Sequence, residues 1–403
     1  MKRRNPERWL RRGALAAAAL LVLAFPQRVL ADGLAEESWI AEEQAAETAA
    51  QAQEIPARSA VLLDAGSGQL LFEKNAHEQM PPASITKVMT LLLVMEAIED
   101  GAIGWKDTVS CSDHAASMGG SQIWLEPGEQ MTVEELVKAA AVKSANDASM
   151  ALAEHVSGSE GAFVDRMNAR ARELGMKDTH FVNPTGLDAE GHMSTAYDVA
   201  LMSRELLRHP EIIQYTTIWM DSLRGGRTSL VNTNKLVRFY EGCTGLKTGT
   251  TDGAGSCLSA SAVRQGISLI AVSMGSDTSD QRFSACKTLL NYGFSSFESY
   301  IPTVPEEELH PIGVRHGVEE AVPLTVPPFE PVLIPKGRSE EVVRTVSLDE
   351  EAEAPVAEGQ RLGEVRFTLD DRVLAQGPVL AQKNIRRMDF STAFLLLFRY
   401  LIR

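Results

Sequence analysis

Residues 81–100, PPASITKVMTLLLVMEAIED, place Ser84 and Lys87 three positions apart at the start of an almost wholly apolar run. A run that is apolar on nearly all sides predicts a helix buried at the centre of a domain, and Asp100 with Gly101 marks its end. Side chains three positions apart on a helix are neighbours. The stretch therefore predicts a serine hydroxyl in contact with a lysine amine in a dry environment.

That pairing suits acyl transfer. A serine hydroxyl is a poor nucleophile at neutral pH unless a base lies within hydrogen-bond reach. Burial lowers the proton affinity of a lysine amine, which makes Lys87 a candidate for the base. The free N–H groups and the dipole at a helix start also favour negative charge developing at Ser84. The alternative is that Ser84 only caps the helix and Lys87 reaches solvent, as any S-x-x-K spacing allows.

Two further stretches carry polar residues at expected element boundaries. In MTVEELVKAAAVKSANDASMALAEH, residues 131–155, Thr132 and Glu135 form a capping box, and the helical pattern breaks at residues 144–146, SAN. In EGCTGLKTGTTDGAGSCLSASAV, residues 241–263, the KTG of residues 247–249 lies on an expected edge hairpin, where a glycine allows a ligand backbone to approach. Singly, these are a polar turn and a solvated strand end. The order S-x-x-K, S-x-N, K-T-G in one domain indicates a serine acyl-transfer site.

Composition and texture divide the 403 residues into parts. The formal net charge of −15 argues against a nucleic-acid partner, which needs a clustered basic face. Residues 58–300 predict one mixed α/β domain, because strand-like segments bracket a long helical middle. Residues 301–381 predict a small all-β domain, because short β-branched runs alternate with Gly, Pro and Asp. Residues 32–57, rich in Ala, Glu and Gln, are interpreted as a linker.

The two ends of the chain each carry an apolar segment. Residues 1–31 combine a basic start, an apolar core from Ala14 to Phe25 and a small-residue exit at Ala31, which predicts a cleaved signal peptide. The alternative is a permanent span, but the core is shorter than the roughly 20 residues that a bilayer requires. Residues 382–403 predict an amphipathic membrane-anchor helix, because Phe and Leu recur at helical spacing among arginines. The protein is therefore expected outside the cytoplasm, on the outer face of the cytoplasmic membrane.

The cysteines and histidines give no sign of a metal site or cofactor. The four cysteines, at positions 111, 243, 257 and 286, show no C-x-x-C spacing, and the eight histidines show no H-E-x-x-H. No metal and no cofactor are predicted. The pairing state of the cysteines is left open.

With these motifs in place, the sequence resembles the penicillin-recognising serine enzymes, most closely the low-molecular-weight penicillin-binding proteins that are D-alanyl-D-alanine carboxypeptidases. The likeness extends to LEPGEQMTVEELVKAAAVKSANDAS, LGMKDTHFVNPTGLDAEGHMST, LVNTNKLV and GLKTGTTDGAGSC, and it covers nearly the whole chain after residue 58. It implies an α/β fold of the β-lactamase and penicillin-binding transpeptidase type, a five-stranded antiparallel sheet flanked by helices, followed by a β-sandwich-like domain.

The resemblance also implies a role for each motif residue. Ser84 would be the acylated nucleophile, Lys87 its base, and Ser144 a proton relay to the departing D-alanine. The substrate-binding residues would be Asn146 at the acyl side, Lys247 and Thr248 near the terminal carboxylate, Gly249, Thr250 through its backbone N–H in the oxyanion hole, and Arg282 at the carboxylate. A planar guanidinium suits a bidentate contact with a carboxylate.

The implied activity is removal of the last D-alanine from peptidoglycan stem pentapeptides, with β-lactams as covalent inhibitors. A secreted β-lactamase is one alternative, but no E-x-x-L-N follows Asn146 to activate a deacylating water, and the middle motif reads SAN rather than SDN. A cross-linking transpeptidase is expected to carry a large domain ahead of the nucleophile, for which residues 1–58 leave no room. A non-enzymatic wall-binding scaffold is expected to have lost a motif residue, and all of them are present. A D,D-endopeptidase acting on cross-links stays open, because the depth of the pocket separates it from a carboxypeptidase.

Overall fold

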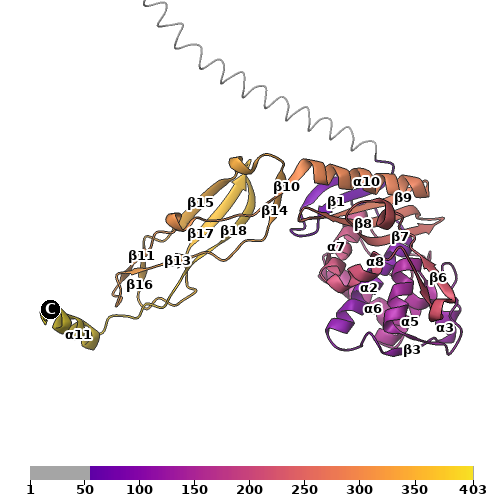
Figure 1. Cartoon of the computed structure of the whole chain (residues 1–403), viewed down its shortest axis with the longest axis horizontal. Coiled ribbons are helices and arrows are strands. Elements are labelled where there is room, and N and C mark those ends of the chain that lie inside the picture. Colours follow the sequence, from indigo (N-terminus) through magenta and orange to yellow (C-terminus); the bar gives the residue numbers. More distant parts are fainter. Residues whose placement is uncertain (1–54, 403) are drawn as a thin grey trace, which may run out of the picture. The chain divides into compact units, whose positions relative to one another are not determined.

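The structure is a computed structural model, and it describes residues 55–402. The signal peptide predicted at residues 1–31 and nearly all of the linker predicted at 32–57 lie outside the described residues. The mixed α/β architecture and the all-β segment that follows it are both confirmed (Figure 1).

A five-stranded antiparallel sheet forms the centre of the first domain, as expected. All six residues of its strand Ser59–Asp64 are buried, because helices cover both faces of the sheet. Val61 and Leu63 join the main core on one face, while Leu62 contacts Gly293 on the other. Across the sheet the strands are β2 (Leu70–Lys74), β1 (Ser59–Asp64), β9 (Ile267–Ser276), β8 (Gly255–Arg264) and β7 (Cys243–Thr251).

One long helix covers one face of this sheet, and a cluster of helices covers the other (Figure 1). The helix of the opening motif lies inside the cluster and is buried on nearly all sides, and it ends at Asp100 and Gly101, as predicted. The single helix is α10 (Ser279–Ser296). The cluster contains α2 (Lys87–Glu99), α3 (Asp113–Ala116), α4 (Val133–Lys138), α5 (Asn146–Ser157), α6 (Glu160–Glu173), α7 (Ala196–Leu207), α8 (Ile213–Thr216) and α9 (Leu236–Phe239).

Two short antiparallel hairpins accompany the helical cluster. The first joins β3 (Thr108–Ser110) to β4 (Gln130–Thr132), and the second joins β5 (Met220–Leu223) to β6 (Thr228–Val231). The predicted capping box is present where β4 leads into α4: the Thr132 hydroxyl accepts from the Glu135 N–H, and the Glu135 carboxylate accepts from the Thr132 N–H.

The C-terminal segment is a separate β-rich fold with its own apolar core. Val365, Phe367 and Val379 are fully buried at its centre. The pairing of β10 with β14 begins four residues ahead of the expected boundary at 301. The strands form three sheets: β10 (Phe297–Tyr300) with β14 (Val332–Pro335); β12 (Ala321–Val322), β11 (Ile312–Arg315) and β16 (Glu351–Glu353); and β13 (Leu324–Thr325), β18 (Arg372–Ala381), β17 (Arg361–Leu369) and β15 (Val343–Leu348).

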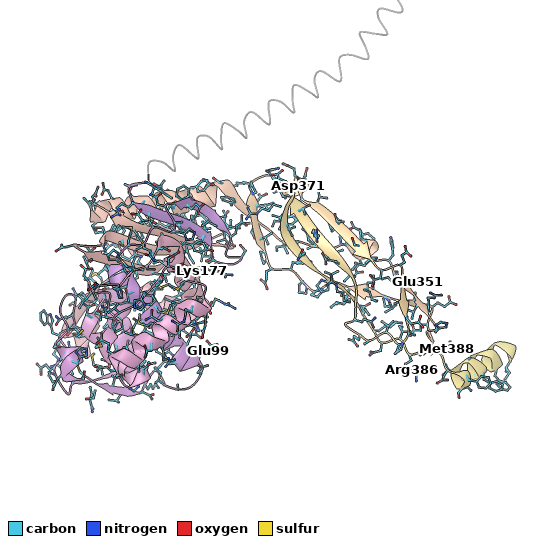
Figure 2. The ribbon with its side chains drawn as sticks, turned by 180° about the vertical axis from the view of Figure 1, so that it is seen from behind. Glu99, Lys177, Glu351, Asp371, Arg386 and Met388 are labelled. Atoms are coloured by element: carbon cyan, nitrogen blue, oxygen red, sulfur yellow. The ribbon has the colours of Figure 1, made fainter. Side chains whose placement is uncertain are left out.

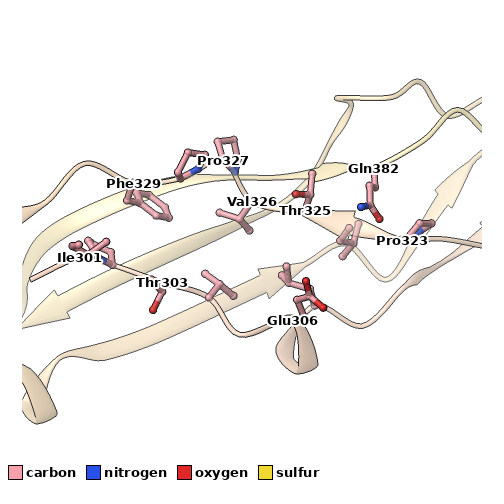
Figure 3. A pocket seen from close by; sticks show the side chains of 14 residues that line it. Ile301, Thr303, Glu306, Pro323, Thr325, Val326, Pro327, Phe329 and Gln382 are labelled. Atoms are coloured by element: carbon pink, nitrogen blue, oxygen red, sulfur yellow. The ribbon is translucent and has the colours of Figure 1, made fainter.

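A pocket of about 510 Å³ lies beside the short edge strand β13 of this fold. Figure 3 shows its walls, which come from the chain around Ile301 and Thr303 and from the stretch between Pro323 and Phe329. Apolar and proline side chains line most of it, and Glu306 is among its lining residues.

The terminal helix α11 (Phe390–Leu401) is shorter than the range 382–403 expected from the sequence. Asp389 caps it by accepting from the Thr392 N–H, so the helix begins after Asp389. The residues before it belong to the β-rich fold, because Gln382 N–H donates to Pro323 O and Ile385 bridges to Val356. Figure 2 shows Met388 at the junction between the two.

Candidate active site

The predicted serine and lysine are in contact. A single 3-10 turn, Ala83–Thr86, carries Ser84, and α2 begins at Lys87. Side chains three apart eclipse each other in such a turn, and Lys87 Nζ lies 3.0 Å from Ser84 Oγ. The side chain of Lys87 is fully buried, while Ser84 is only half-buried. A substrate can therefore reach the hydroxyl while the amine stays out of water.

Two acceptors fix the amine of Lys87 besides the serine. Its Nζ donates to the side-chain oxygen of Asn146 at 2.6 Å and to the carbonyl oxygen of Thr185 at 2.5 Å. Burial lowers the pKa of Lys87 well below its ordinary value, and the nearby charge of Lys247 lowers it further, against an opposing effect of Asp147. Burial and the charge of Lys247 therefore favour a neutral amine that can accept a proton, while Asp147 favours the charged form.

The S-x-N motif lies where one helix ends and the next begins, as predicted. A π-turn, Ala139–Lys143, follows α4 and ends at Ser144, whose φ of 64° is uncommon for a residue with a side chain. The next helix, α5, begins at Asn146. Asn146 is held at three points: its N–H donates to Ser121 O, its Nδ2 to Gly119 O, and its Oδ1 accepts from Lys87. One Nδ2 hydrogen is left for a ligand.

The K-T-G motif lies on β7 at the edge of the sheet, which confirms the predicted edge hairpin. The structure shows a packing reason for the glycine that the sequence did not predict. A Cβ at Gly249 would lie 3.0 Å from Pro82 O and from the Ala83 side chain, so the glycine lets β7 lie against the chain's own Ser84 turn. Thr248 Oγ1 donates to Thr233 Oγ1 at 2.7 Å.

Lys247 is buried on β7. Burial, and after it the charge of Arg282, lowers the pKa of Lys247 to about 7. Its Nζ donates to the carbonyl oxygen of Thr248 at 2.9 Å. Within residues 55–402, Lys247 Nζ makes no hydrogen bond to Ser144. The two lysines, both with lowered pKa values, still give the site a positive field when either is protonated.

Arg282, on α10, is 8% exposed and lies behind β7. Its Nη1 donates to Gly249 O at 2.9 Å and to Thr250 Oγ1 at 2.6 Å, and its Nη2 donates to Ser279 Oγ at 3.2 Å. Its Nε is enclosed and has no partner in the described structure. One Nη2 hydrogen therefore remains for a ligand, so the guanidinium in this conformation offers a single hydrogen bond rather than the bidentate pair expected.

Two contact residues were not predicted from the sequence, Thr185 and Thr233. Both lie in stretches that the family resemblance includes, residues 174–195 and 230–237. Thr185 acts through its backbone carbonyl, which no residue letter reveals, and Thr233 is recognisable only by its contact with Thr248. The four cysteines are free thiols.

Comparison with known proteins places this geometry in a family. The family described as D-alanyl-D-alanine carboxypeptidase matches residues 46–278, and the family described as penicillin-binding protein 5, C-terminal domain, matches residues 297–387. D-alanyl-D-alanine carboxypeptidase DacF of Bacillus subtilis is 43% identical over 340 residues, which cover 83% of this chain and 87% of the relative. DacA of Escherichia coli is 33% identical over 84% of this chain and 85% of the relative.

Solved structures agree with the sequence relatives. Penicillin-binding protein 5 of Haemophilus influenzae superimposes with a TM-score of 0.73 at 32% identity, covering 83% of this chain and 98% of that one. Penicillin-binding protein D2 of Listeria monocytogenes, in its ampicillin-bound form, gives a TM-score of 0.55 at 32% identity over 60% of this chain and 98% of that one.

Proposed function

The chain belongs to the D-alanyl-D-alanine carboxypeptidase family, and from this premise we propose that it removes the terminal D-alanine from peptidoglycan stem pentapeptides through an acyl-enzyme on Ser84. The observation that carries the proposal is the 3.0 Å contact between the Ser84 hydroxyl and the buried amine of Lys87. A serine hydroxyl needs such a base for attack at neutral pH.

In the acylation step, Ser84 Oγ attacks the carbonyl carbon of the scissile peptide bond while Lys87 Nζ takes the hydroxyl proton. The negative charge on the carbonyl oxygen is received by the backbone N–H groups of Ser84 and Thr250, and such a donor contributes roughly 3 kcal/mol to lowering a barrier. The C–N bond then breaks, and the departing D-alanine amine receives its proton through Ser144. Water attacks the acyl carbon in the second half, and Ser84 regains its proton.

The remaining motif residues bind the substrate. The free Nδ2 hydrogen of Asn146 suits the carbonyl on the acyl side. Thr248 suits the terminal carboxylate as a hydrogen-bond donor, and Lys247 on β7 and Arg282 behind it supply positive charge. Gly249 keeps the edge strand close to the nucleophile. β-Lactams are expected to acylate Ser84 at the same site, because they present an acyl carbon and a carboxylate to the same groups.

Peptidoglycan lies outside the cytoplasm, which supports export of the protein to the outer face of the cytoplasmic membrane. We propose that α11 lies on that membrane. Phe390, Phe394 and Phe398 are 86%, 59% and 54% exposed, and their rings follow one another at 6.5 and 6.4 Å. An exposed apolar helix face beside basic residues suits an anionic bilayer surface. Within residues 55–402, the helices are too short or too polar to cross a membrane.

The test uses purified protein and a pentapeptide that ends in D-Ala-D-Ala, with released D-alanine as the readout. We expect release by the wild type, none by the Ser84→Ala variant, and one penicillin adduct that maps to Ser84 by mass spectrometry. An adduct on Ser84→Ala would contradict the nucleophile. Release from cross-linked dimers at the same rate as from pentapeptide would instead indicate an endopeptidase.

A further inference from the structure

Residues 183–188, NPTGLD, form a loop between α6 and α7 that contacts Lys87 and the strand β7, which carries the K-T-G motif. The catalytic roles proposed above do not use this loop. Thr185 O accepts from Lys87 Nζ at 2.5 Å, and Asp188 Oδ1 accepts from Thr251 Oγ1 at 2.7 Å. Leu187 lies near the segment next to Asn146, because a Cβ at Gly120 would lie 3.6 Å from Leu187 Cδ2.

Asn183 holds the loop in shape from within. Its Oδ1 accepts from the Thr185 N–H at 3.1 Å, from Thr185 Oγ1 at 2.9 Å and from the Gly186 N–H at 2.7 Å. Its Nδ2 donates to Leu187 O at 2.9 Å. One side chain therefore holds the Pro184–Thr185 peptide unit and the planar Thr185–Gly186 unit that contains the Thr185 carbonyl, and so sets the direction in which that carbonyl points.

Residues of α2 and of the Ser84 turn also hold this loop in place. Thr90 Oγ1 donates to Pro184 O at 2.6 Å. Gly186 has a φ of 82°, and a Cβ there would lie 1.8 Å from Ala83 O, so only glycine fits. His192 Nδ1 accepts from the Val182 N–H, which leaves its proton on Nε2, 2.8 Å from Thr86 Oγ1. These contacts fix the position of the loop relative to the Ser84 turn.

The partners of Lys87 decide where its lone pair points. A neutral amine has two N–H donors and one lone pair. The Thr185 carbonyl and the Asn146 side-chain oxygen can only accept, so together they engage both N–H groups. The third contact, at 3.0 Å, is with Ser84 Oγ, and the lone pair is what remains to face it. Without the Thr185 carbonyl, the amine could donate an N–H to Ser84 and lose its direction as a base.

We propose that Asn183 is a positioning residue of the acylation step, which acts by holding the Thr185 carbonyl so that the lone pair of Lys87 faces the Ser84 hydroxyl. The inference rests on the proposed function of Ser84 and Lys87. It adds a residue that touches neither the substrate nor the reacting atoms. Misdirected proton transfer should reduce the rate on the order of 100-fold, since a positioned base contributes about 10²- to 10⁴-fold.

The chain offers a matched control for Asn183. Asn168, on α6, braces the same loop region two residues earlier: its Oδ1 accepts from the Phe181 N–H at 2.9 Å, and its Nδ2 donates to Phe181 O at 2.8 Å. It does not hold the Thr185 carbonyl. Asn168→Leu and Asn183→Leu therefore remove the same kind of brace, and only the second reaches Lys87.

The experiment measures acylation by a fluorescent penicillin at several concentrations, so that the maximal acylation rate constant is separated from the binding constant. For Asn183→Leu we expect a loss on the order of 100-fold in the rate constant with little change in binding. Asn168→Leu should lower the melting temperature but keep the rate constant within about threefold. Asn183→Asp keeps the acceptor oxygens, so it should recover most of the rate at high pH.

The pH profile of Asn183→Asp gives an independent readout. The charged groups that face Lys87 are Lys247 from β7 and Asp147 from α5. A new carboxylate behind Thr185 adds a negative charge and favours the ammonium form, so the acid limb of the acylation profile should move to higher pH. A folded Asn183→Leu that acylates at the wild-type rate, or an equal loss in Asn168→Leu, would overturn the proposal.

Two controls keep the outcomes separate. If Asn183→Leu does not fold, Asn183→Ala, which removes the same four hydrogen bonds without adding a larger side chain, replaces it. A rate constant for that variant equal to the wild-type value would then overturn the proposal. The Ser84→Ala variant is run in parallel, because a penicillin adduct on it would show that the assigned nucleophile is wrong, whatever the Asn183 variants do.

Discussion

Replacing Arg282 tests how the site distinguishes a free carboxylate from a neutral chain end. Its Nη1 holds Gly249 O and Thr250 Oγ1, and one Nη2 hydrogen remains for a ligand. Arg282→Ala therefore has two effects, a loosened strand that lowers the rate on every substrate and a lost charge that matters only for an anionic one. Only the difference between substrates reports on recognition.

The size of that difference follows from the single remaining hydrogen bond. A hydrogen bond to a charged group contributes about 1.5–3 kcal/mol, and 1.36 kcal/mol is tenfold in rate. Arg282→Ala should therefore lower kcat/KM roughly 10- to 100-fold more for the free acid than for its C-terminal amide. A bidentate contact would give a larger ratio.

The assay compares D-alanine release from a peptide ending in D-Ala-D-Ala with D-alaninamide release from its amide. Arg282→Lys serves as the matched variant, because it keeps a charge but cannot span both Gly249 O and Thr250 Oγ1. We expect it to recover part of the free-acid preference while keeping the loss common to both substrates. Equal factors for the two substrates in Arg282→Ala would refute carboxylate recognition and leave the residue as a brace for β7.

Three further outcomes are expected. The penicilloyl-enzyme should be long-lived, because no E-x-x-L-N motif follows Asn146 to activate water, and rapid repeated penicillin hydrolysis would favour the β-lactamase alternative. Lys247→Met should raise the melting temperature more at pH 6 than at pH 9. A lysine with a folded-state pKa of about 7 destabilises the fold fully below pH 7, and this cost falls as the pH rises toward the pKa of the unfolded chain. A difference in melting temperature that does not change with pH would contradict this. Ending the chain after Met388 should abolish binding to anionic liposomes and keep activity, whereas unchanged binding would mean that α11 is not the anchor.

The features that the sequence predicted correctly depend on signals within a few residues. The end of α2 at Gly101, the capping box of Thr132 and Glu135, and the break before Asn146 all lie within one or two helical turns of their cause. The edge hairpin of β7 and β8 follows from strand pattern and a Gly/Asp turn. For these elements, local propensity and tertiary packing agree.

The features that were missed depend on contacts between distant residues. Lys87 and Thr185 are 98 positions apart, and the contact uses a backbone carbonyl that any residue could supply. The close packing of Gly249 on β7 against Pro82 brings together residues that are far apart in the sequence, so no local pattern predicts it. The helix was expected from residue 382 but begins at Phe390, because pairing of Ile385 with Val356 fixes the preceding residues in the β-rich fold.

The charges of the site also link substrate choice to proton transfer. Lys87, Lys247 and Arg282 bring three basic groups together, while the charge of Asp147 opposes the lowered pKa of Lys87. Burial therefore favours the neutral form of both lysines. A substrate carboxylate near Thr248 adds the missing negative charge and favours protonation of Lys247, the lysine whose pKa is already near 7. A protonated Lys247 repels a proton on Lys87 and lowers its pKa, so a bound carboxylate that favours protonation of Lys247 also helps Lys87 to remain the unprotonated base. A neutral peptide end supplies no such charge, so Lys247 is protonated less readily beside it and Lys87 is kept neutral less effectively than when a free carboxylate is bound.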